Sequence, residues 1–450
     1  MFKSINQLLK LSFPVLIAQL AQTLMGFVDT VMVGQVSALD VAAVALGNSI
    51  WLPTIIVIGG AIMALPAMVA HHYGSQNYQA IRSLIIQGLY MALACSLVAA
   101  AFLYSTRFGL EQITNNAELS RLTGHYLLAL MCGAPAFLLF QCLRGMTEGM
   151  SVTKPSMIIG FTGFLVNIPA NYLFIYGGFG LPAMGGVGSG IATALVYWVM
   201  LFTLIGCIAF NHTFKPVKLF SKLTKVDRAI QLQLIKQGMP IAIAVFLEVA
   251  VFACISIALS PLGTDVIASN QIAVNFTTLT MMIPLAIGTA VTVRVGYVTG
   301  QGTPHQAKNI LRSGLVITII TSCLVIIIIS YFQHSIVRLY SADAAVHELG
   351  MTLLICSALF QLPNAIQTIY VAGLRGLRDT LPIMYVAFTC YWLIGMSTAF
   401  LLGFTDILIP KLGASGAWIG FIFGLVLAGF VLHQRFNQRL STFKTLEQSS

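Results

Sequence analysis

Long apolar stretches separated by short polar segments dominate the pattern along this chain. A membrane-spanning helix needs roughly 20 mostly apolar residues to cross a hydrocarbon layer about 30 Å thick. Twelve windows meet this requirement, at residues 11–34, 41–70, 84–104, 124–146, 156–178, 187–210, 238–260, 267–298, 311–332, 349–374, 381–403 and 414–434. The pattern predicts an all-α polytopic membrane protein with twelve transmembrane helices.

The basic residues between these windows predict the orientation of the chain. Because the number of spans is even, both termini lie on the same side of the membrane. Of the 23 Lys and Arg residues, 19 fall on that side and four on the other. Cytoplasmic loops carry an excess of Lys and Arg, so both termini are expected in the cytoplasm. The net charge of +10 then follows from topology, and no nucleic-acid partner is needed to explain it.

Composition and motifs exclude several classes of protein. Charged residues make up 8% of the chain, whereas a soluble domain carries about 25%. The sequence contains no GxxxxGK[ST] loop and no GxSxG or HExxH motif, which argues against an ATP-driven pump and against an enzyme. The eight cysteines are scattered singly through apolar runs, as expected of small buried hydrophobes rather than disulfides or metal ligands.

The second half of the chain repeats the first at an offset of 225–228 residues. ALDVAAVALGN at 38–48 resembles GTDVIASNQIA at 263–273, and SVTKPSM at 151–157 resembles LRDTLPIM at 377–384. A unit of six spans keeps its orientation when it is duplicated, so the halves are parallel repeats. Carriers of this kind place their substrate between the repeats and work by alternating access.

The repeat predicts the domain boundaries. These are an N-terminal six-helix bundle at 1–212, a cytoplasmic linker at 213–236, a C-terminal six-helix bundle at 237–434 and a cytoplasmic tail at 435–450. The basic linker can form an amphipathic helix on an anionic membrane surface. It can equally be a tether that only satisfies the positive-inside rule, and the residue pattern leaves both readings open.

Two acidic residues fall well inside predicted spans, Asp29 in the first and Glu248 in the seventh. Ionisable groups at such depth are expensive and usually face a cavity or a partner. A carboxylate shielded from water can carry a proton, and with oxygen ligands nearby it can hold a sodium ion. The alternative is a structural acid that is hydrogen-bonded to a neighbouring helix.

Two amides form a second polar group in the fifth span. Asn167 and Asn171 are spaced i, i+4, so they share one helix face, and Pro169 between them frees backbone carbonyls. Together with Asp29 and Thr193 they can complete an oxygen-lined pocket in the first half. Amides also serve as plain interhelical hydrogen bonds, and spacing does not separate the two roles.

Several long motifs stand in a fixed order along the chain. They are QTLMGFVDTVMVGQVSALDVAAVALGNSIW, EGMSVTKPSMIIGFTGFLVNIPANYLFIYG, GGVGSGIATALVYW, MIPLAIGTAVTVRVG and GLRGLRDT. Together they resemble the multidrug and toxic compound extrusion (MATE) family in its NorM-like branch, over nearly the whole chain. The resemblance implies two pseudo-symmetric six-helix bundles that open alternately to the two sides of the membrane. It also implies the export of cationic, amphipathic drugs and dyes in exchange for sodium ions or protons.

The resemblance also assigns site residues. The family's first-helix acid falls on Asp29 and its seventh-helix acid on Glu248. The other ligands of the first half fall on Asn167, Asn171 and Thr193.

The tenth helix departs from the family pattern. NorM-like members commonly carry an aspartate there, and this chain has Asn364; a nearby tyrosine of some members is Phe360. An amide can offer oxygen to sodium but adds neither charge nor a proton site. We therefore expect a weaker cation site in the second half and a larger role for Asp29.

These features predict a monomeric multidrug efflux antiporter of the bacterial inner membrane, with a role in antibiotic resistance. Its partners are cationic small molecules and the lipid bilayer, and no cofactor is expected besides the coupling ion. The alternative is a lipid-linked oligosaccharide flippase of the same superfamily, which should bind pyrophosphate with several buried Arg or Lys residues. The deep charges are acids, which argues against it. An ion channel fits poorly with two lobes and two unequal buried acids.

Overall fold

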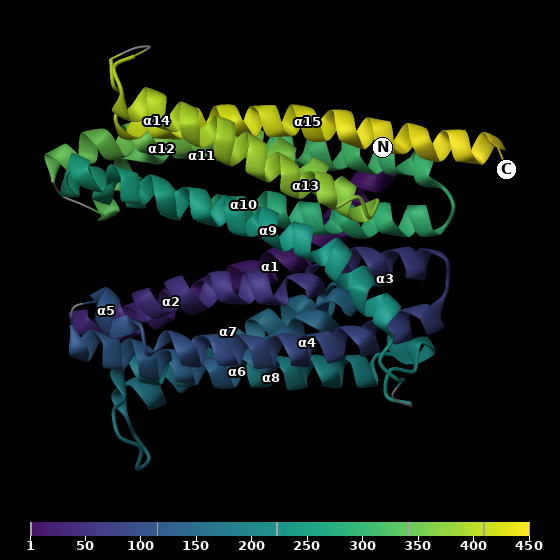
Figure 1. The fold of residues 1–450 in the computed structure, drawn as a ribbon, viewed down its shortest axis with the longest axis horizontal. Helices are drawn as coiled ribbons and strands as arrows, with labels where there is room; N and C mark the ends of the chain where they lie inside the picture. Colours follow the sequence, from purple (N-terminus) through teal and green to yellow (C-terminus); the bar gives the residue numbers. More distant parts are fainter. Residues whose placement is uncertain (1, 115, 222–223, 341–342, 408–409, 450) are drawn as a thin grey trace. The chain divides into compact units, whose positions relative to one another are not determined.

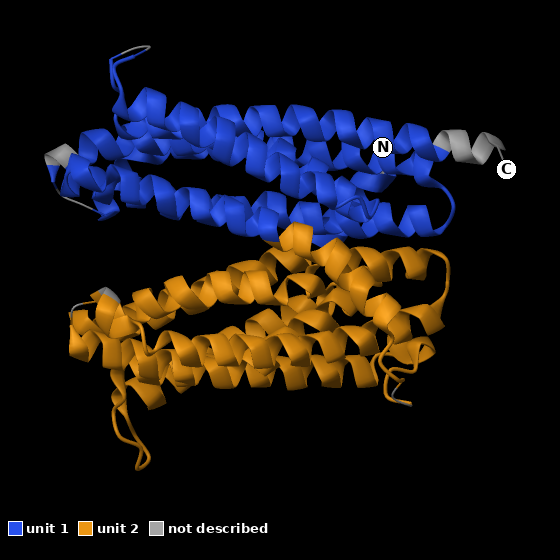
Figure 2. Cartoon of the chain, viewed as in Figure 1, with its two compact units in different colours: residues 1–12, 243–450 blue, residues 13–242 orange. Residues whose placement is uncertain are grey.

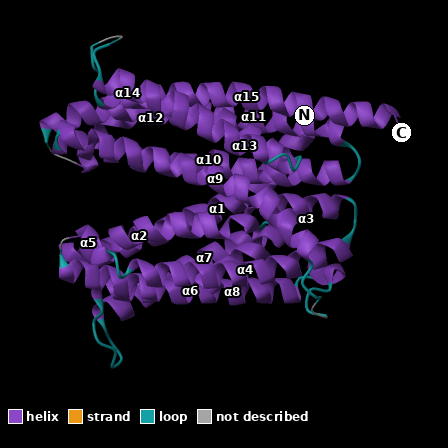
Figure 3. Ribbon diagram, in the orientation of Figure 1, coloured by secondary structure: helices purple, strands orange, loops and turns teal. Residues whose placement is uncertain are grey.

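The computed structural model describes residues 2–114, 116–221, 224–340, 343–407 and 410–449. Over these residues the protein is helical, with one isolated β-bridge between Gly178 and Leu181 and no strand (Figure 3). Twelve of the described helical segments are long and apolar enough to cross a membrane, which confirms the predicted number of spans. The chain divides into two compact units, residues Phe13–Ala242 (unit 2) and residues Met1–Ser12 with Ile243–Ser450 (unit 1) (Figure 2).

The first six spans supply most of unit 2, together with short connecting turns (Figure 1). Their bounds are α1 (Phe2–Gly34), α2 (Ala38–Ile58), η1 (Gly59–Ala64), α3 (Leu65–Gly74), α4 (Tyr78–Thr106), α5 (Leu110–Thr114), α6 (Ala117–Gly149), α7 (Lys154–Tyr176), α8 (Gly185–Phe210) and η2 (His212–Val217). The second span runs through α2, η1 and α3 without a break.

The last six spans supply most of unit 1. Their bounds are α9 (Arg228–Leu259), η3 (Ser260–Leu262), α10 (Thr264–Gly300), η4 (Pro304–Gln306), α11 (Ala307–Tyr340), α12 (Ala344–Gly376), α13 (Leu381–Val386), η5 (Ala387–Met396), α14 (Ser397–Phe404) and α15 (Ala414–Ser449). The eleventh span contains a π-helical stretch, η5, between α13 and α14.

Most helices are longer than the apolar windows that predict them. The window at 124–146 lies inside α6, which begins seven residues earlier. Asn116 caps that helix, because its Oδ1 accepts the backbone N–H of Glu118 at 3.0 Å and of Leu119 at 3.1 Å. Hydropathy marks only the part of a helix that meets hydrocarbon, whereas the helix itself ends where its terminal N–H and C=O groups find partners.

The turn after the fourth span of each half has the same backbone conformation, as expected of a duplicated unit. Ser151 has φ 63° and its N–H donates to the carbonyl of Glu148 at 2.8 Å. Arg378 has φ 60° and its N–H donates to the carbonyl of Arg375 at 3.0 Å. Positive φ is uncommon for residues other than glycine. Its recurrence at an offset of 227 residues makes Glu148 and Arg375 equivalent positions of the two repeats.

The first helix of each repeat begins in the opposite unit. Residues 2–12 of α1 belong to unit 1, where the Arg294 Nη2 donates to the Oε1 of Gln7 at 2.9 Å. Residues 228–242 of α9 belong to unit 2. There a Cβ at Gly238 would overlap the carbonyl oxygen of Gly60, so α9 crosses η1 at backbone contact. The two helices change unit close to Pro14 and Pro240, respectively.

The basic linker is not one continuous helix. It contains the short turn η2, and α9 begins only at Arg228. Between them, the carbonyl of Thr224 accepts the hydroxyl of Tyr90 at 2.9 Å and that of Lys225 accepts the amide of Gln87 at 2.8 Å, so α4 holds this segment. Residues 222–223 of the linker lie outside the described residues.

Candidate functional site

Asp29 on α1 receives hydrogen bonds from two other helices of unit 2. The Oδ1 of its carboxylate accepts the amide Nδ2 of Asn167 at 2.9 Å and that of Asn171 at 2.5 Å, both from α7. Its Oδ2 accepts the hydroxyl of Thr193 from α8 at 3.3 Å. The four residues assigned to the first half therefore form one cluster, in which three donors surround one carboxylate.

Close packing of α1 against α7 brings these groups together. A Cβ at Gly160 of α7 would lie 2.9 Å from the Cα of Ala18 on α1, so the missing side chain allows the helices to touch there. Asp29 and Asn171 each stand eleven residues beyond that contact on their own helix, a distance of about three helical turns. The contact between Ala18 and Gly160 thus sets which turns of α1 and α7 face each other at Asp29 and Asn171.

The two amide oxygens of the cluster have no hydrogen-bond donor facing them among the described residues. Asn167 and Asn171 are almost fully buried, and the Oδ1 of each is a buried atom without a hydrogen-bond partner in the described part of the chain. Buried polar atoms are nearly always paired. A carboxylate, two amides and a hydroxyl also form a set of oxygen ligands suited to a hard cation such as sodium. The residues present therefore fit a cation.

Aromatic side chains that sequence analysis did not single out lie in the same unit. Tyr126 and Tyr197 are within electrostatic range of Asp29. The ring of Tyr197 stacks on that of Trp51 with 6.4 Å between centroids and lies 4.9 Å from the ring of Phe137. These residues come from α2, α6 and α8, so no periodicity along one helix could have grouped them. Aromatic faces attract cations, particularly where water is excluded.

Glu248 of α9 is in a different setting in unit 1. It lies within electrostatic range of Arg375, in the last turn of α12, and of Tyr391 in η5. The Nε of Arg375 is buried and has no hydrogen-bond partner among the described residues. Arg375 is one of the 19 basic residues that sequence analysis assigned to the cytoplasmic side, and it was not paired with an acid. Its position equivalent to Glu148 in the repeat does not indicate that an acid lies near it.

Asn364 of α12 belongs to a buried polar chain. Its Oδ1 accepts the Nε2 of Gln367 at 3.3 Å, and the Oε1 of Gln367 accepts the hydroxyl of Tyr391 at 2.9 Å. The structure gives no hydrogen bond between Glu248 and Asn364, although Tyr391 links the surroundings of both. Phe360 is fully buried against Phe421, with 5.4 Å between ring centroids, and belongs to the apolar core.

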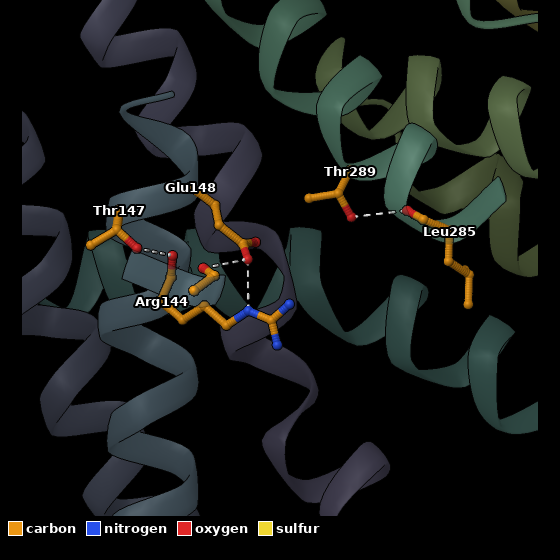
Figure 4. Close-up of polar contacts among 6 residues, drawn as sticks. Arg144, Thr147, Glu148, Leu285 and Thr289 are labelled. Carbon is orange, nitrogen blue, oxygen red and sulfur yellow. Dashed lines mark hydrogen bonds and ion pairs between the residues drawn. The ribbon is translucent and has the colours of Figure 1, made fainter. Parts of the chain in front are cut away.

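A buried ion pair at the end of α6 is a further acidic group that sequence analysis missed. The Nε of Arg144 donates to the Oε1 of Glu148 at 2.6 Å (Figure 4). The hydroxyl of Ser156 donates to the same oxygen at 3.1 Å. Glu148 is 4% exposed. Because Glu148 stands near the end of α6, its position in the sequence is typical of a solvent-exposed residue. Arg144, one turn away on the same helix, explains why Glu148 can be buried.

Two repeated helical bundles, each with an acid inside its spans, define a duplicated polytopic membrane protein. The chain belongs to the MatE family, whose sequence profile matches residues 14–173 and 240–401. It is 44% identical over 436 residues to a probable multidrug resistance protein NorM of Shewanella oneidensis, covering 96% of this chain and 95% of that protein. It is 42% identical over 433 residues to a multidrug resistance protein NorM of Vibrio vulnificus, with the same coverage of both chains. These matches confirm the resemblance drawn from the motifs.

The fold agrees with solved structures of the family. A crystal structure of a eukaryotic MATE transporter aligns with a TM-score of 0.86 at 18% identity and covers 99% of both chains. At that identity the likeness concerns the fold alone, and it confirms the predicted twelve-helix architecture. The family match and the names of the two bacterial relatives confirm the expectation of a transporter rather than an enzyme.

Proposed function

We propose that this protein is a secondary multidrug antiporter that exports cationic, amphipathic drugs and dyes in exchange for sodium ions or protons. The names of the two bacterial relatives support multidrug export. The observation that carries the proposal is the carboxylate of Asp29, which three donors from α7 and α8 hold inside unit 2. Acids at depth in membrane proteins serve ion and proton pathways.

The coupling cation of the first half binds at Asp29, Asn167, Asn171 and Thr193. Rotation of either amide about its terminal bond exchanges the nitrogen that faces Asp29 for the oxygen that lacks a partner. The same residues then offer sodium a ring of oxygens instead of offering the carboxylate a ring of donors. A proton needs only Asp29, so both ions remain part of the proposal.

The second half contributes Glu248 and Asn364 as a weaker coupling site. Asn364 brings an amide oxygen without charge, and its buried Nδ2 has no hydrogen-bond partner in the described residues. The guanidinium of Arg375 competes electrostatically with any cation at Glu248, because both act on the same carboxylate. These two features support assigning the main coupling role to Asp29.

The substrate chemistry follows from the surroundings of Asp29. Trp51, Phe137 and Tyr197 provide aromatic faces, and Asp29 provides negative charge nearby. An organic cation with a flat apolar body can interact with both. Aromatic contacts do not demand one fixed pattern of hydrogen bonds, which suits a carrier of varied compounds.

Transport proceeds by alternating access of the two lobes. A cation that enters from the outer side favours the conformation in which it binds more tightly, and only this difference in affinity can shift the population. Drug release and cation uptake are thereby linked. The proposed setting is the bacterial inner membrane, with both termini in the cytoplasm, and the proposed working form is the monomer.

The test is ethidium transport into everted membrane vesicles, whose cytoplasmic face lies outside, with a sodium gradient and a pH gradient imposed one at a time. We expect efflux to respond to at least one of the two gradients. Expression should also raise resistance to cationic dyes. Loss of dye transport under both gradients, with transport of a lipid-linked oligosaccharide instead, would favour the flippase alternative.

A further inference from the structure

A pocket lined by basic side chains opens among η4, α11, α12 and α15 of unit 1. Its volume is about 500 Å³. His305, Lys308, Arg312 and His433 line it, and its described lining contains no Asp or Glu. None of these residues belongs to either cation site. The pocket therefore has the charge of a site for an anion.

The start of α11 concentrates positive charge on the pocket. Lys308 and Arg312 are spaced i, i+4, so they project from the same face of the helix. Both lie in its first two turns, where the helix dipole adds partial positive charge. His305 precedes them in η4. His305, Lys308 and Arg312 thus line the same pocket from a segment of eight residues, 305–312.

A chain of hydrogen bonds orients a hydroxyl donor on the opposite wall. The amide Nδ2 of Asn437 lies 3.0 Å from the Nε2 of His433, and the Nδ1 of that ring lies 2.8 Å from the hydroxyl oxygen of Tyr370. Because an amide nitrogen only donates, the Nε2 accepts and the Nδ1–H donates to Tyr370. The hydroxyl hydrogen of Tyr370 then has no acceptor among the described residues, and Tyr370 is only 8% exposed. It is a donor left for a ligand.

The floor of the pocket is apolar. Leu311 of α11 and Phe436 and Leu440 of α15 are buried there. Two turns beyond Arg312, α11 exposes Ile319 on the same face, within a span apolar enough to cross a membrane. A charged rim that continues into an apolar helix surface matches a headgroup with acyl chains, whereas a free phosphate would use the rim alone.

We propose that this pocket binds the phosphodiester headgroup of an anionic phospholipid from the cytoplasmic leaflet. Lys308 and Arg312 pair with the phosphate, Tyr370 donates its hydroxyl to a phosphate oxygen, and the acyl chains lie along α11. Basic pockets between transmembrane helices on the cytoplasmic side bind such headgroups in other membrane proteins. The leaflet follows from the predicted positive-inside orientation. The lipid acts as a structural ligand of unit 1, so the proposal does not depend on which ion drives transport.

The test titrates the purified full-length protein with phosphatidylglycerol and, separately, with phosphatidylcholine, and counts bound lipids by native mass spectrometry. We expect one phosphatidylglycerol to bind at least about tenfold more tightly than phosphatidylcholine. Removing both charges with Lys308→Gln/Arg312→Gln should weaken the phosphatidylglycerol about thirtyfold. Tyr370→Phe should weaken it about tenfold, because a hydrogen bond to a charged group is lost.

The matched control is Lys215→Gln/Arg228→Gln, which removes one Lys and one Arg from exposed positions on the same predicted side of the membrane. It should leave the tight phosphatidylglycerol in place. Equal loss in both double variants would mean general attraction between charges and would overturn the proposal. Displacement of the lipid from the wild-type protein by millimolar inorganic phosphate would assign the pocket to free phosphate and would also overturn it. Should the double variant not fold, Arg312→Glu serves in its place, with the same expected loss.

Discussion

Asn171 and Asp29 are joined by a hydrogen bond of 2.5 Å between the amide Nδ2 on α7 and the carboxylate Oδ1 on α1. Asn167 donates to the same oxygen from one turn earlier on α7. The carboxylate is thus tied to two successive turns of its neighbour. A cation that draws Asp29 away must break both bonds, so occupancy of the carboxylate and the packing of α1 on α7 are linked.

Replacing the central acid should abolish coupling. Asp29→Asn keeps the size of the side chain but removes the charge and the proton site, so we expect no ethidium efflux above the vector background under a sodium or a pH gradient. The measurement is fluorescence in everted vesicles, with the amount of inserted protein determined by immunoblot. Asp265→Asn, at an exposed acid of the second half, is the control and should transport normally. Wild-type efflux by the Asp29 variant would remove the mechanism.

Asn171 should be important for transport although its side chain carries no charge. Asn171→Ala leaves Asp29 short of its closest donor, and a lost hydrogen bond to a charged group costs about 1.5–3 kcal/mol. We expect ethidium efflux to fall about tenfold or more. Asn309→Ala changes an exposed amide on α11 and should have no effect. If both variants transported equally well, the hydrogen bond would be incidental to coupling.

A carboxylate placed in the second half should strengthen its cation site. Asn364→Asp supplies charge beside Gln367 in the buried chain that leads to Tyr391. We expect the concentration of sodium that gives half-maximal stimulation of efflux to fall. Asn309→Asp adds the same charge at an exposed position and controls for its general effect. An unchanged sodium response in Asn364→Asp would argue that the second half takes no part in coupling.

Much of the fold and part of the site follow from the sequence, for identifiable physical reasons. Hydropathy finds spans because lipid demands about 20 apolar residues for each. The i, i+4 spacing of Asn167 and Asn171 predicts a shared face, and the structure places both beside Asp29. The structure brings these three residues together. Their part in coupling ion flow to drug export is what we propose.

What the sequence leaves unpredicted depends on contacts between distant segments. Glu148 looks solvated by position and is buried, because Arg144 and Ser156 satisfy its carboxylate. The aromatic group of Trp51, Phe137 and Tyr197 is drawn from three helices. No feature of the sequence indicates that an acid lies near Arg375. Each of these depends on how helices pack, which periodicity within one helix does not encode.

The ion pair of Arg144 and Glu148 should contribute to stability. Their side chains are 13% and 6% exposed, and removing one member of a buried pair costs about 3 kcal/mol. We expect Glu148→Gln to lower the midpoint of thermal unfolding of the purified protein. Arg144→Gln/Glu148→Gln should recover part of the loss, because no lone charge remains.

The pair of Arg435 and Asp379 is the comparison for that experiment. Arg435 is 40% exposed, so its removal should cost much less, about 1 kcal/mol or below. A smaller effect for Glu148→Gln than for Arg435→Gln would contradict the assignment of the first pair as buried.

The crossing of α9 and η1 should tolerate no side chain. A Cβ at Gly60 would overlap the Cβ of Ala242, whereas a Cβ at Gly206 would meet nothing within 4 Å. We expect Gly60→Val to reduce the yield of monodisperse protein in size-exclusion chromatography severely, and Gly206→Val to leave it unchanged. Normal yield from both variants would show that the two segments can separate without harm.

Glu148 and Arg375 share one place in the ancestral unit and now carry opposite charges. A chain assembled from two copies of the first half would bring a second carboxylate to that place, and one assembled from two copies of the second half would bring a second guanidinium. Each symmetric protein would carry one of the two arrangements twice and lack the other, because Glu148 pairs with Arg144 inside the first half and Arg375 acts on Glu248 inside the second. Divergence after gene duplication has therefore made the halves of this protein non-interchangeable, although their backbones still follow the same turns.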